Sequence, residues 1–360
     1  MGRKRRKQLW WIILFVFIIL LISGGLLVWF APEPPRDELK LARESLAAAQ
    51  KAGAEVYATS LYQDAHRLYD SVMVCWAVQN DRFFINRNYE KVQSFAREVT
   101  GKAIQAKENS ILQSRDANLL VKKGIPDLER KVELYERIYK HNPLPSSVIR
   151  AHNRGQMKLS EARIAFVGNR FNEAKVHYQQ AAELINSSNS KAEKIFQEWF
   201  AQYPVWKKHG NEAVRLSGGG KRVVLIDKYA HRCMIYQGGK VIRQFDAEFG
   251  LNWMGDKLRR GDKATPEGIY RITQKKDGAR TKFHRALLIN FPNDEDRRKF
   301  AGHHDLGGLI EIHGLGGKGV DWTDGCVALK NEDMDVLFSL AGSGTPVIIV
   351  GSLRPISDIR

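Results

Sequence analysis

The first strong pattern along the chain is an uncharged, mostly apolar run from Leu9 to Phe30. A helix needs about 20 such residues to cross a bilayer core, so the run predicts a membrane-spanning helix. Five cations at positions 3–7 precede it, and such cations stay on the cytoplasmic side. Residues 29–32 offer no small-x-small exit for a cleaved signal peptide. We expect a single-pass inner-membrane anchor with a cytoplasmic N-terminus and a periplasmic bulk after Pro32.

Residues 36–210 then read as helices, because Ala, Leu, Glu, Lys and Gln dominate them. Two stretches share the order aromatic, Ala three residues later and Tyr four residues further: Tyr62, Ala65, Tyr69 and Phe171, Ala174, Tyr178. This contact pattern is similar to that of tetratricopeptide-type helical hairpins. A break at residues 142–146 favours several antiparallel helices joined by short turns. Such a region could serve as a spacer or could bind a protein partner, and both readings stay open.

After a Gly-rich segment at 211–220, expected to be a flexible linker, the pattern changes to short β-like runs. These runs are 223–226, 233–236, 241–245, 269–272, 286–291 and 346–350. Gly238 and Gly239 predict a hairpin turn, and Asn331 is placed to cap a helix that ends at Leu340. The expected fold class is multi-domain α+β, with an N-terminal transmembrane helix, an α-helical hairpin region and a C-terminal mostly-β domain. The expected boundaries are 1–35, 36–210, 211–220, 221–352 and a tail at 353–360.

The net charge limits the class of binding partner, and the number of cysteines limits disulfide and zinc frameworks. A formal net charge of +17, from 57 Lys and Arg against 40 Asp and Glu, favours an anionic partner. Nucleic acid is disfavoured, because the bulk is expected outside the cytoplasm and no recognition motif is present. The cysteines are Cys75, Cys233 and Cys326, too few for a disulfide framework or a zinc cluster. Cys75 and Cys233 are either bridged or, as we prefer, two inert packed thiols.

Candidate chemistry gathers near the C-terminus. A strand-like run at 308–312 delivers His313, and Cys326 follows in a turn, which suggests cysteine acyl transfer. A thiol has a pKa near about 8.5, so His313 must accept its proton or hold it as an ion pair. The amides of Gly325 and of Cys326 in this turn are candidates for stabilising an oxyanion. The carbonyl of Gly314 is a candidate for orienting the imidazole.

Other residues near this chemistry have more than one reading. Thr323 is expected to orient substrate or loop through its hydroxyl. Asp324 could orient an imidazolium, contact a substrate ammonium or simply be a solvated turn residue, and Asn331 could brace the site or only cap a helix. Candidate substrate contacts are aromatic or basic: Trp253, Tyr270, Phe283, Trp322, Arg259, Arg260, Lys263, Lys282 and Arg285. The His303, His304 and Asp305 cluster has unconvincing metal spacing, so we expect neither a metal nor another cofactor.

Three segments together resemble L,D-transpeptidase catalytic domains of the YkuD type: residues 261–270, 312–314 and 323–331. The likeness spans about 221–350 and implies a β-sandwich with His313 as general base and Cys326 as nucleophile. Asp324 stands where a second His is usual, and Ala328 where an Arg is common. The loop from His313 to Cys326 is also shorter than in most members. These departures resemble a branch that includes enzymes acting on the lipoprotein linkage to peptidoglycan, some of them hydrolytic.

The resemblance implies a periplasmic enzyme that acts on peptidoglycan stem tetrapeptides through a cysteine acyl-enzyme. The acyl group could pass to another stem's amine, to a lipoprotein's terminal Lys or to water. A different class, a cell-wall-binding scaffold whose helices recruit partners, stays open as an alternative. Its prediction is that Cys326 shows no special reactivity.

Overall fold

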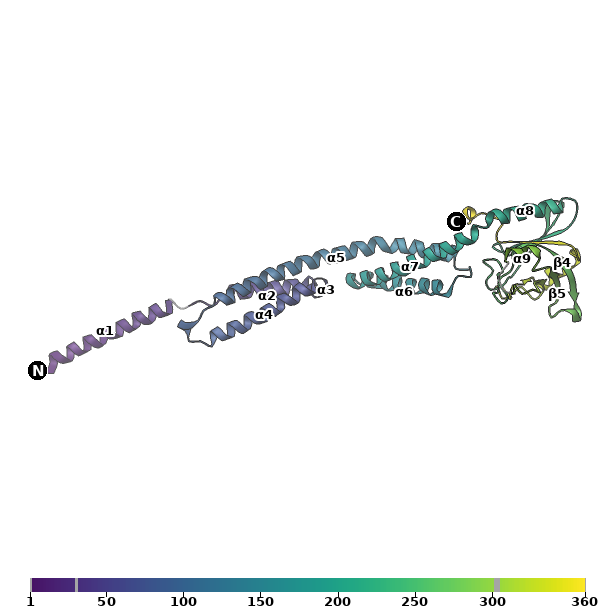
Figure 1. Cartoon of the computed structure of the whole chain (residues 1–360). Helices are drawn as coiled ribbons and strands as arrows, with labels where there is room; N and C mark the ends of the chain where they lie inside the picture. Colours follow the sequence, from purple (N-terminus) through teal and green to yellow (C-terminus); the bar gives the residue numbers. More distant parts are fainter. Residues whose placement is uncertain (1, 30–31, 301–304, 360) are drawn as a thin grey trace. The chain divides into compact units, whose positions relative to one another are not determined.

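The computed structural model describes residues 2–29, 32–300 and 305–359 (Figure 1). The chain divides into two compact units, Met1–Pro126 with Lys158–Gln180 and Asp127–Met157 with Ala181–Arg360. The expected boundary at residue 210 is therefore not where the structure divides. The reason is packing: buried side chains at the end of the helical region, among them Phe196 and Trp199, belong to the same hydrophobic core as the sheet.

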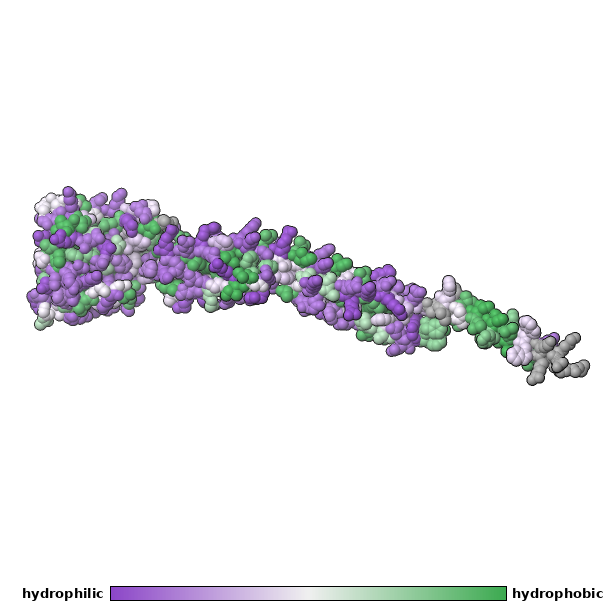
Figure 2. Space-filling model, turned by 180° about the vertical axis from the view of Figure 1, so that it is seen from behind, coloured by the Kyte–Doolittle hydropathy of each residue, from purple (hydrophilic) through white to green (hydrophobic). Residues whose placement is uncertain are grey.

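Helix α1 (Gly2–Trp29) contains the expected apolar segment. Gln8–Leu27, 20 residues, is long and apolar enough to cross a membrane, although a signal sequence would have the same length and composition. Its large apolar side chains are exposed, and Figure 2 shows them as a band of hydrophobic surface. Phe30, which was expected to end the run, lies outside the described residues, as does Ala31.

Helices fill the chain from residue 36 to residue 217, as the composition predicts. They are α2 (Arg36–Lys51), α3 (Ala54–Tyr57), α4 (Thr59–Asn80), the 3-10 turn η1 (Phe84–Asn86), α5 (Glu90–Ile138), α6 (Ser146–Val167), α7 (Phe171–Phe200) and α8 (Tyr203–Ser217). The contact role expected for the alanines is confirmed, since Ala65 and Ala174 are fully buried and Tyr62 is nearly so. The helical structure is interrupted between α5 and α6, where the sequence predicted a break. Helix α5 itself is continuous over 49 residues, with Pro126 inside it.

The C-terminal part forms a sheet of eight strands in the order β3-β2-β1-β8-β4-β5-β6-β7. The strands are β1 (Val223–Asp227), β2 (Arg232–Gln237), β3 (Lys240–Asp246), β4 (Gly268–Asp277), β5 (Arg285–Ile289), β6 (Glu311–His313), β7 (Val327–Ala328) and β8 (Pro346–Val350). The two halves share β4, whose pairing with β5 shifts register between Ile272 and Gln274. A bulge of this kind bends a strand, so a single curled mixed sheet forms the expected β-domain.

Local turn chemistry explains how two of these strands begin. Gly238 and Gly239 have φ angles of 64° and 74° and close the β2–β3 hairpin, as predicted. The run at 308–312 becomes a strand only at Glu311, because Leu309 has a φ angle of 58°, outside the range of extended backbone. The strand is therefore shorter than its apolar pattern suggests.

Two helices pack on the sheet. Helix α8 packs on β1, β2 and β8, and α10 (Asn331–Leu340) packs on β5; the short helix α9 (Asp294–Lys299) follows β5 in the chain. The expected flexible linker at 211–220 is mostly helix, and Ala213 and Ser217 in it are buried. That expectation was wrong because an apolar face of the segment meets the sheet. Asn331 is the first residue of α10 rather than its cap, which is Lys330.

Candidate active site

Cys326 and His313 are brought together by the pairing of two short strands. Strand β6 ends at His313, and β7 begins one residue after Cys326. The two strands run parallel, with Ile312 opposite Val327 and His313 opposite Ala328. Because neighbouring strands lie about 4.8 Å apart, this register places the thiol beside the strand that carries the imidazole.

The imidazole of His313 is held rigidly. It is 1% exposed, and its ring stacks on Phe283 at a centroid distance of 3.5 Å and an interplanar angle of 8°. Trp322 contacts it edge-on at 5.9 Å. Nδ1 lies 2.6 Å from the Gly314 carbonyl oxygen, which can only accept, so Nδ1 carries the proton and Nε2 is left as the basic nitrogen.

Two lysines lie over the aromatic side chains that flank His313. Lys282 Nζ is 5.1 Å from the centroid of Phe283, and Lys318 Nζ is 3.3 Å from that of Trp322. Burial lowers the pKa of His313, and these two cations lower it further, against the opposing effect of the Gly314 carbonyl. The ring is therefore neutral at pH 7 and able to accept a proton.

The thiol of Cys326 is protonated in this state. Burial raises its pKa to about 11, and the carboxylates of Glu311 and Asp324 act in the same direction. Sγ donates to the carbonyl oxygen of Leu309 at 3.7 Å. The resting pair is thus a thiol and a neutral imidazole rather than a thiolate and an imidazolium.

The turn before Cys326 is closed by one side chain. Thr323 Oγ1 donates to the Cys326 carbonyl oxygen at 2.7 Å and accepts from the Gly325 amide at 3.2 Å. Of the two amides expected to face an oxyanion, that of Gly325 is therefore directed to Thr323 here. Gly325 has a φ angle of 127°, and a Cβ atom there would lie 2.6 Å from the Ala264 carbonyl oxygen. Only glycine suits both constraints.

Asn331 braces the loop that follows His313. Its Oδ1 accepts a hydrogen bond from the Leu315 amide at 2.8 Å, and a Cβ atom on Gly314 would lie 2.7 Å from the same oxygen. Arg285 helps from the other side, since its carbonyl oxygen accepts from the Gly314 amide at 3.0 Å. The guanidinium of Arg285 is 3.1 Å from Asp335 on α10, so its charge is already paired.

Two expected substrate contacts differ in position. Trp322 is half-buried beside His313, and its Nε1 donates to Glu248 Oε2 at 2.8 Å. Trp253 is 2% exposed and packs edge-on against Trp199, at 5.4 Å between ring centroids. Its assignment as a substrate contact was wrong, because an apolar aromatic cluster buries it. His303 and His304 lie outside the described residues.

Cys326 opens onto a cleft of about 370 Å³, lined by Lys276, Arg280, Thr281, Lys282, Phe283, Gly308, Leu309, Ile310, Glu311, Asp324 and Cys326. A second cleft of about 460 Å³ shares Asp324 and the segment from Gly308 to Ile310 with it, and adds Lys257, Arg260 and Lys263. Asp324 is exposed and faces both clefts. Cations thus outnumber carboxylates around the thiol, which suits an anionic ligand.

Glu311 was not among the residues expected in the site. Its side chain is nearly buried, and its carboxylate is 2.7 Å from Lys276 Nζ on β4. A signal was present, since residues i and i+2 of a strand share a face and Glu311 stands two residues before His313. An acidic residue between Ile310 and Ile312 in an apolar strand calls for a buried partner.

The match to known proteins falls on this part of the chain. Residues 221–349 match the YkuD family, described as the L,D-transpeptidase catalytic domain. The resemblance inferred from the motifs around His313 and Cys326 is therefore confirmed, and the C-terminal domain is an L,D-transpeptidase catalytic domain of the YkuD type.

The match covers only part of each relative's length. The protein "Putative L,D-transpeptidase YafK" of Escherichia coli K12 is 29% identical over 120 residues, which is 33% of this chain and 38% of that protein. The crystal structure of the helical cell shape determining protein Pgp2 from Campylobacter jejuni is 28% identical, with a TM-score of 0.32, and the match covers 38% of this chain and 49% of that one. Bd1075 from Bdellovibrio bacteriovorus is 22% identical, with a TM-score of 0.31, over 39% and 52%. The chain thus spans half or less of most of these relatives.

Proposed function

We propose that this chain is a membrane-anchored periplasmic cysteine acyltransferase, an L,D-transpeptidase that acts on peptidoglycan stem tetrapeptides. The observation that carries the proposal is the β6–β7 register, which sets Cys326 beside a buried His313 whose Nδ1 is fixed by the Gly314 carbonyl. The helix Gln8–Leu27 would supply the anchor, with the basic tip in the cytoplasm. The catalytic chemistry would then face the cell wall.

The proposed reaction begins when the Cys326 proton passes to Nε2 of His313. The thiolate attacks the carbonyl carbon on the donor side of the bond that follows meso-diaminopimelate, and a tetrahedral intermediate forms. Its collapse breaks the C–N bond, and the imidazolium returns the proton to the departing D-Ala amine. A thioester on Cys326 remains. An acceptor amine then attacks this thioester, His313 takes the amine's proton, and the thiol is restored as the product leaves.

The resting state gives this scheme a gating step. Sγ donates to Leu309 and not to His313, and the pKa values of the two groups are displaced away from ion-pair formation. Binding of a substrate in the Cys326 cleft would replace the Leu309 contact and move the thiol toward the imidazole. The cations that line the cleft would attract the carboxylates of a stem peptide.

The test is to incubate the full chain, in detergent, with purified muropeptides and to identify products by mass spectrometry. Cross-linked dimers with released D-Ala indicate transfer to a stem amine. Released lipoprotein peptide from lipoprotein-linked muropeptides indicates hydrolysis, the behaviour of an L,D-endopeptidase. Cys326→Ala should abolish any such product, while Cys75→Ala, in α4, should leave it unchanged.

An unchanged muropeptide pool with the wild-type chain would contradict the enzyme proposal. In that case a binding scaffold would explain the domain better, and the chain should still sediment with purified peptidoglycan. Products that persist in Cys326→Ala would contradict the assignment of the nucleophile.

A further inference from the structure

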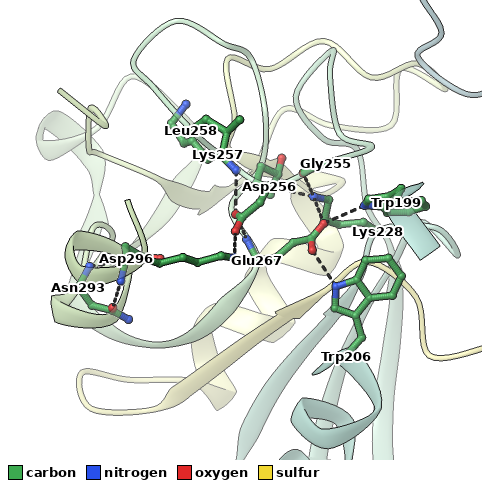
Figure 3. Close-up of polar contacts among 12 residues, drawn as sticks. Trp199, Trp206, Lys228, Gly255, Asp256, Lys257, Leu258, Glu267, Asn293 and Asp296 are labelled. Carbon is green, nitrogen blue, oxygen red and sulfur yellow. Dashed lines mark hydrogen bonds and ion pairs between the residues drawn. The ribbon is translucent and has the colours of Figure 1, made fainter. Parts of the chain in front are cut away.

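Glu267, immediately before β4, collects hydrogen bonds from three separate elements (Figure 3). Trp199 Nε1 on α7 donates at 3.2 Å, Trp206 Nε1 on α8 at 2.7 Å and Lys228 Nζ after β1 at 2.8 Å. The carboxylate is 8% exposed and the lysine side chain 0%. Two of the donors thus come from helices outside residues 221–349, the part that matches the catalytic domain.

Lys228 uses all three of its ammonium protons. Besides Glu267, Nζ donates to the Gly255 carbonyl oxygen at 2.5 Å and to the Thr265 carbonyl oxygen at 2.9 Å. A buried ammonium with three partners is fully satisfied, and its removal would leave these two carbonyl oxygens without this donor and Glu267 without its counter-charge. Lys228 therefore fixes two points of the loop from Gly255 to Thr265.

This loop is the wall against which the catalytic turn lies. Thr265 Oγ1 accepts from the Gly250 amide at 3.2 Å, and the Leu251 amide donates to the Thr323 carbonyl oxygen at 3.2 Å. The Ala264 carbonyl oxygen lies so close to Gly325 that no side chain fits between them. A continuous set of contacts thus leads from the two indoles through Glu267 and Lys228 to the turn that carries Cys326.

We propose that Lys228 and Glu267, held by Trp199 and Trp206, are positioning residues for the Cys326 turn. The ends of α7 and α8 thereby belong functionally to the catalytic domain, although they lie before it in the chain. This inference rests on the proposed function, because it assigns the network a role in the chemistry of Cys326. Misplacement of a reacting group by about 1 Å can cost roughly 100-fold in rate, so a small shift of this wall would be felt.

The competing explanation is that the network only stabilises the fold. Both explanations predict a lower melting temperature when a donor is removed. Only positioning predicts that kcat falls in protein that is still folded while KM stays nearly constant. The reason is that the catalytic turn moves, whereas the cleft at Cys326 has no lining residue from the loop Gly255–Thr265.

The decisive variant is Trp206→Phe in the full chain, which keeps a ring but removes the hydrogen bond to Glu267. Its matched control is Phe200→Leu, since Phe200 packs edge-on against Trp206 in the same cluster and donates nothing to Glu267. With muropeptide substrate we expect Trp206→Phe to lower kcat about tenfold with KM within about twofold. Phe200→Leu should lower the melting temperature comparably and leave kcat within about twofold. Equal kcat values for the two variants would overturn the inference.

A second readout does not depend on turnover. A loosened turn exposes Cys326 and lowers its raised pKa, so Trp206→Phe should speed its alkylation by iodoacetamide at pH 8 by about threefold or more. Phe200→Leu should not. The double variant Lys228→Met/Glu267→Gln should reproduce the effect of Trp206→Phe. If the wild type turns over no muropeptide, the function proposal fails alone; unchanged alkylation in all variants removes the positioning proposal alone.

Discussion

The carbonyl oxygen of Leu309 accepts a hydrogen bond from the thiol of Cys326, at a donor–acceptor distance of 3.7 Å. Leu309 has a φ angle of 58°, a left-handed conformation that is uncommon for a leucine, and its side chain is exposed. A carbonyl oxygen can accept a hydrogen bond only from the neutral thiol, so this contact favours the protonated form of Cys326. Leu309 lines both clefts.

The first prediction concerns the pH dependence of Cys326. Since its pKa is raised to about 11, the thiolate fraction should grow about tenfold for each pH unit from 7 to 10. Alkylation by iodoacetamide, followed by peptide mass spectrometry, should therefore accelerate across this whole range. Cys233, fully buried with a pKa raised to about 12, should stay unmodified and serves as the internal control. A plateau already reached at pH 7 would indicate a resting thiolate–imidazolium pair and contradict the structure.

The second prediction concerns Glu311. Its carboxylate raises the pKa of Cys326, so Glu311→Gln should lower that pKa and speed alkylation at pH 8 several-fold. The single variant leaves the partly buried Lys276 without its partner, so its free energy of unfolding should fall by about 1–3 kcal/mol in denaturant unfolding.

The double variant Glu311→Gln/Lys276→Met separates the two effects. It should recover most of the lost stability, because no unpaired charge remains. Slower alkylation in Glu311→Gln than in the wild type would show that the carboxylate does not act on the thiol as proposed.

The third prediction concerns Gly325. Gly325→Ala imposes a Cβ atom 2.6 Å from the Ala264 carbonyl oxygen at a φ angle of 127°, so the turn must shift. We expect kcat/KM to fall about 100-fold and stability to fall by about 1–3 kcal/mol. Gly342→Ala is the matched control, since a Cβ atom there meets nothing within 4 Å and its φ is not positive. Activity within about threefold of the wild type in Gly325→Ala would refute the role of the turn.

The fourth prediction concerns Asn331. Asn331→Ala removes the acceptor of the Leu315 amide and releases the loop that carries the Gly314 carbonyl, so His313 loses orientation. We expect kcat to fall about tenfold. Asn331→Asp keeps an acceptor oxygen at the same place and should retain most of the activity, whereas a purely structural role would change only the melting temperature in both variants.

Much of the architecture followed from pattern alone. The apolar run, the helical region and six of the eight strands were legible because each is long enough to show its periodicity. Strand β6 was predicted as part of the longer run at 308–312, whereas β7 has two residues, too short for any pattern. The pairing of these two strands, which brings Cys326 beside the strand of His313, was not predicted from the sequence.

Trp253 was misjudged, and Lys228 and Glu267 were not singled out, for the same reason. All three are buried by segments distant in the chain. The burial of a charged side chain depends on partners that local sequence does not reveal, here indoles 61 and 68 residues before Glu267. For the same reason the stretch from 211 to 220 resembled a tether and is instead docked on the sheet.

The packing of α8 on β1, β2 and β8 affects how the catalytic domain can be produced as a separate fragment. A recombinant fragment that starts at Lys221, where the family match begins, would lack α8 and expose the apolar face of the sheet that α8 covers. It would also lack Trp199 and Trp206, the two indole donors to the buried carboxylate of Glu267. Such a fragment should precipitate, and its failure would say nothing about the activity of the full chain.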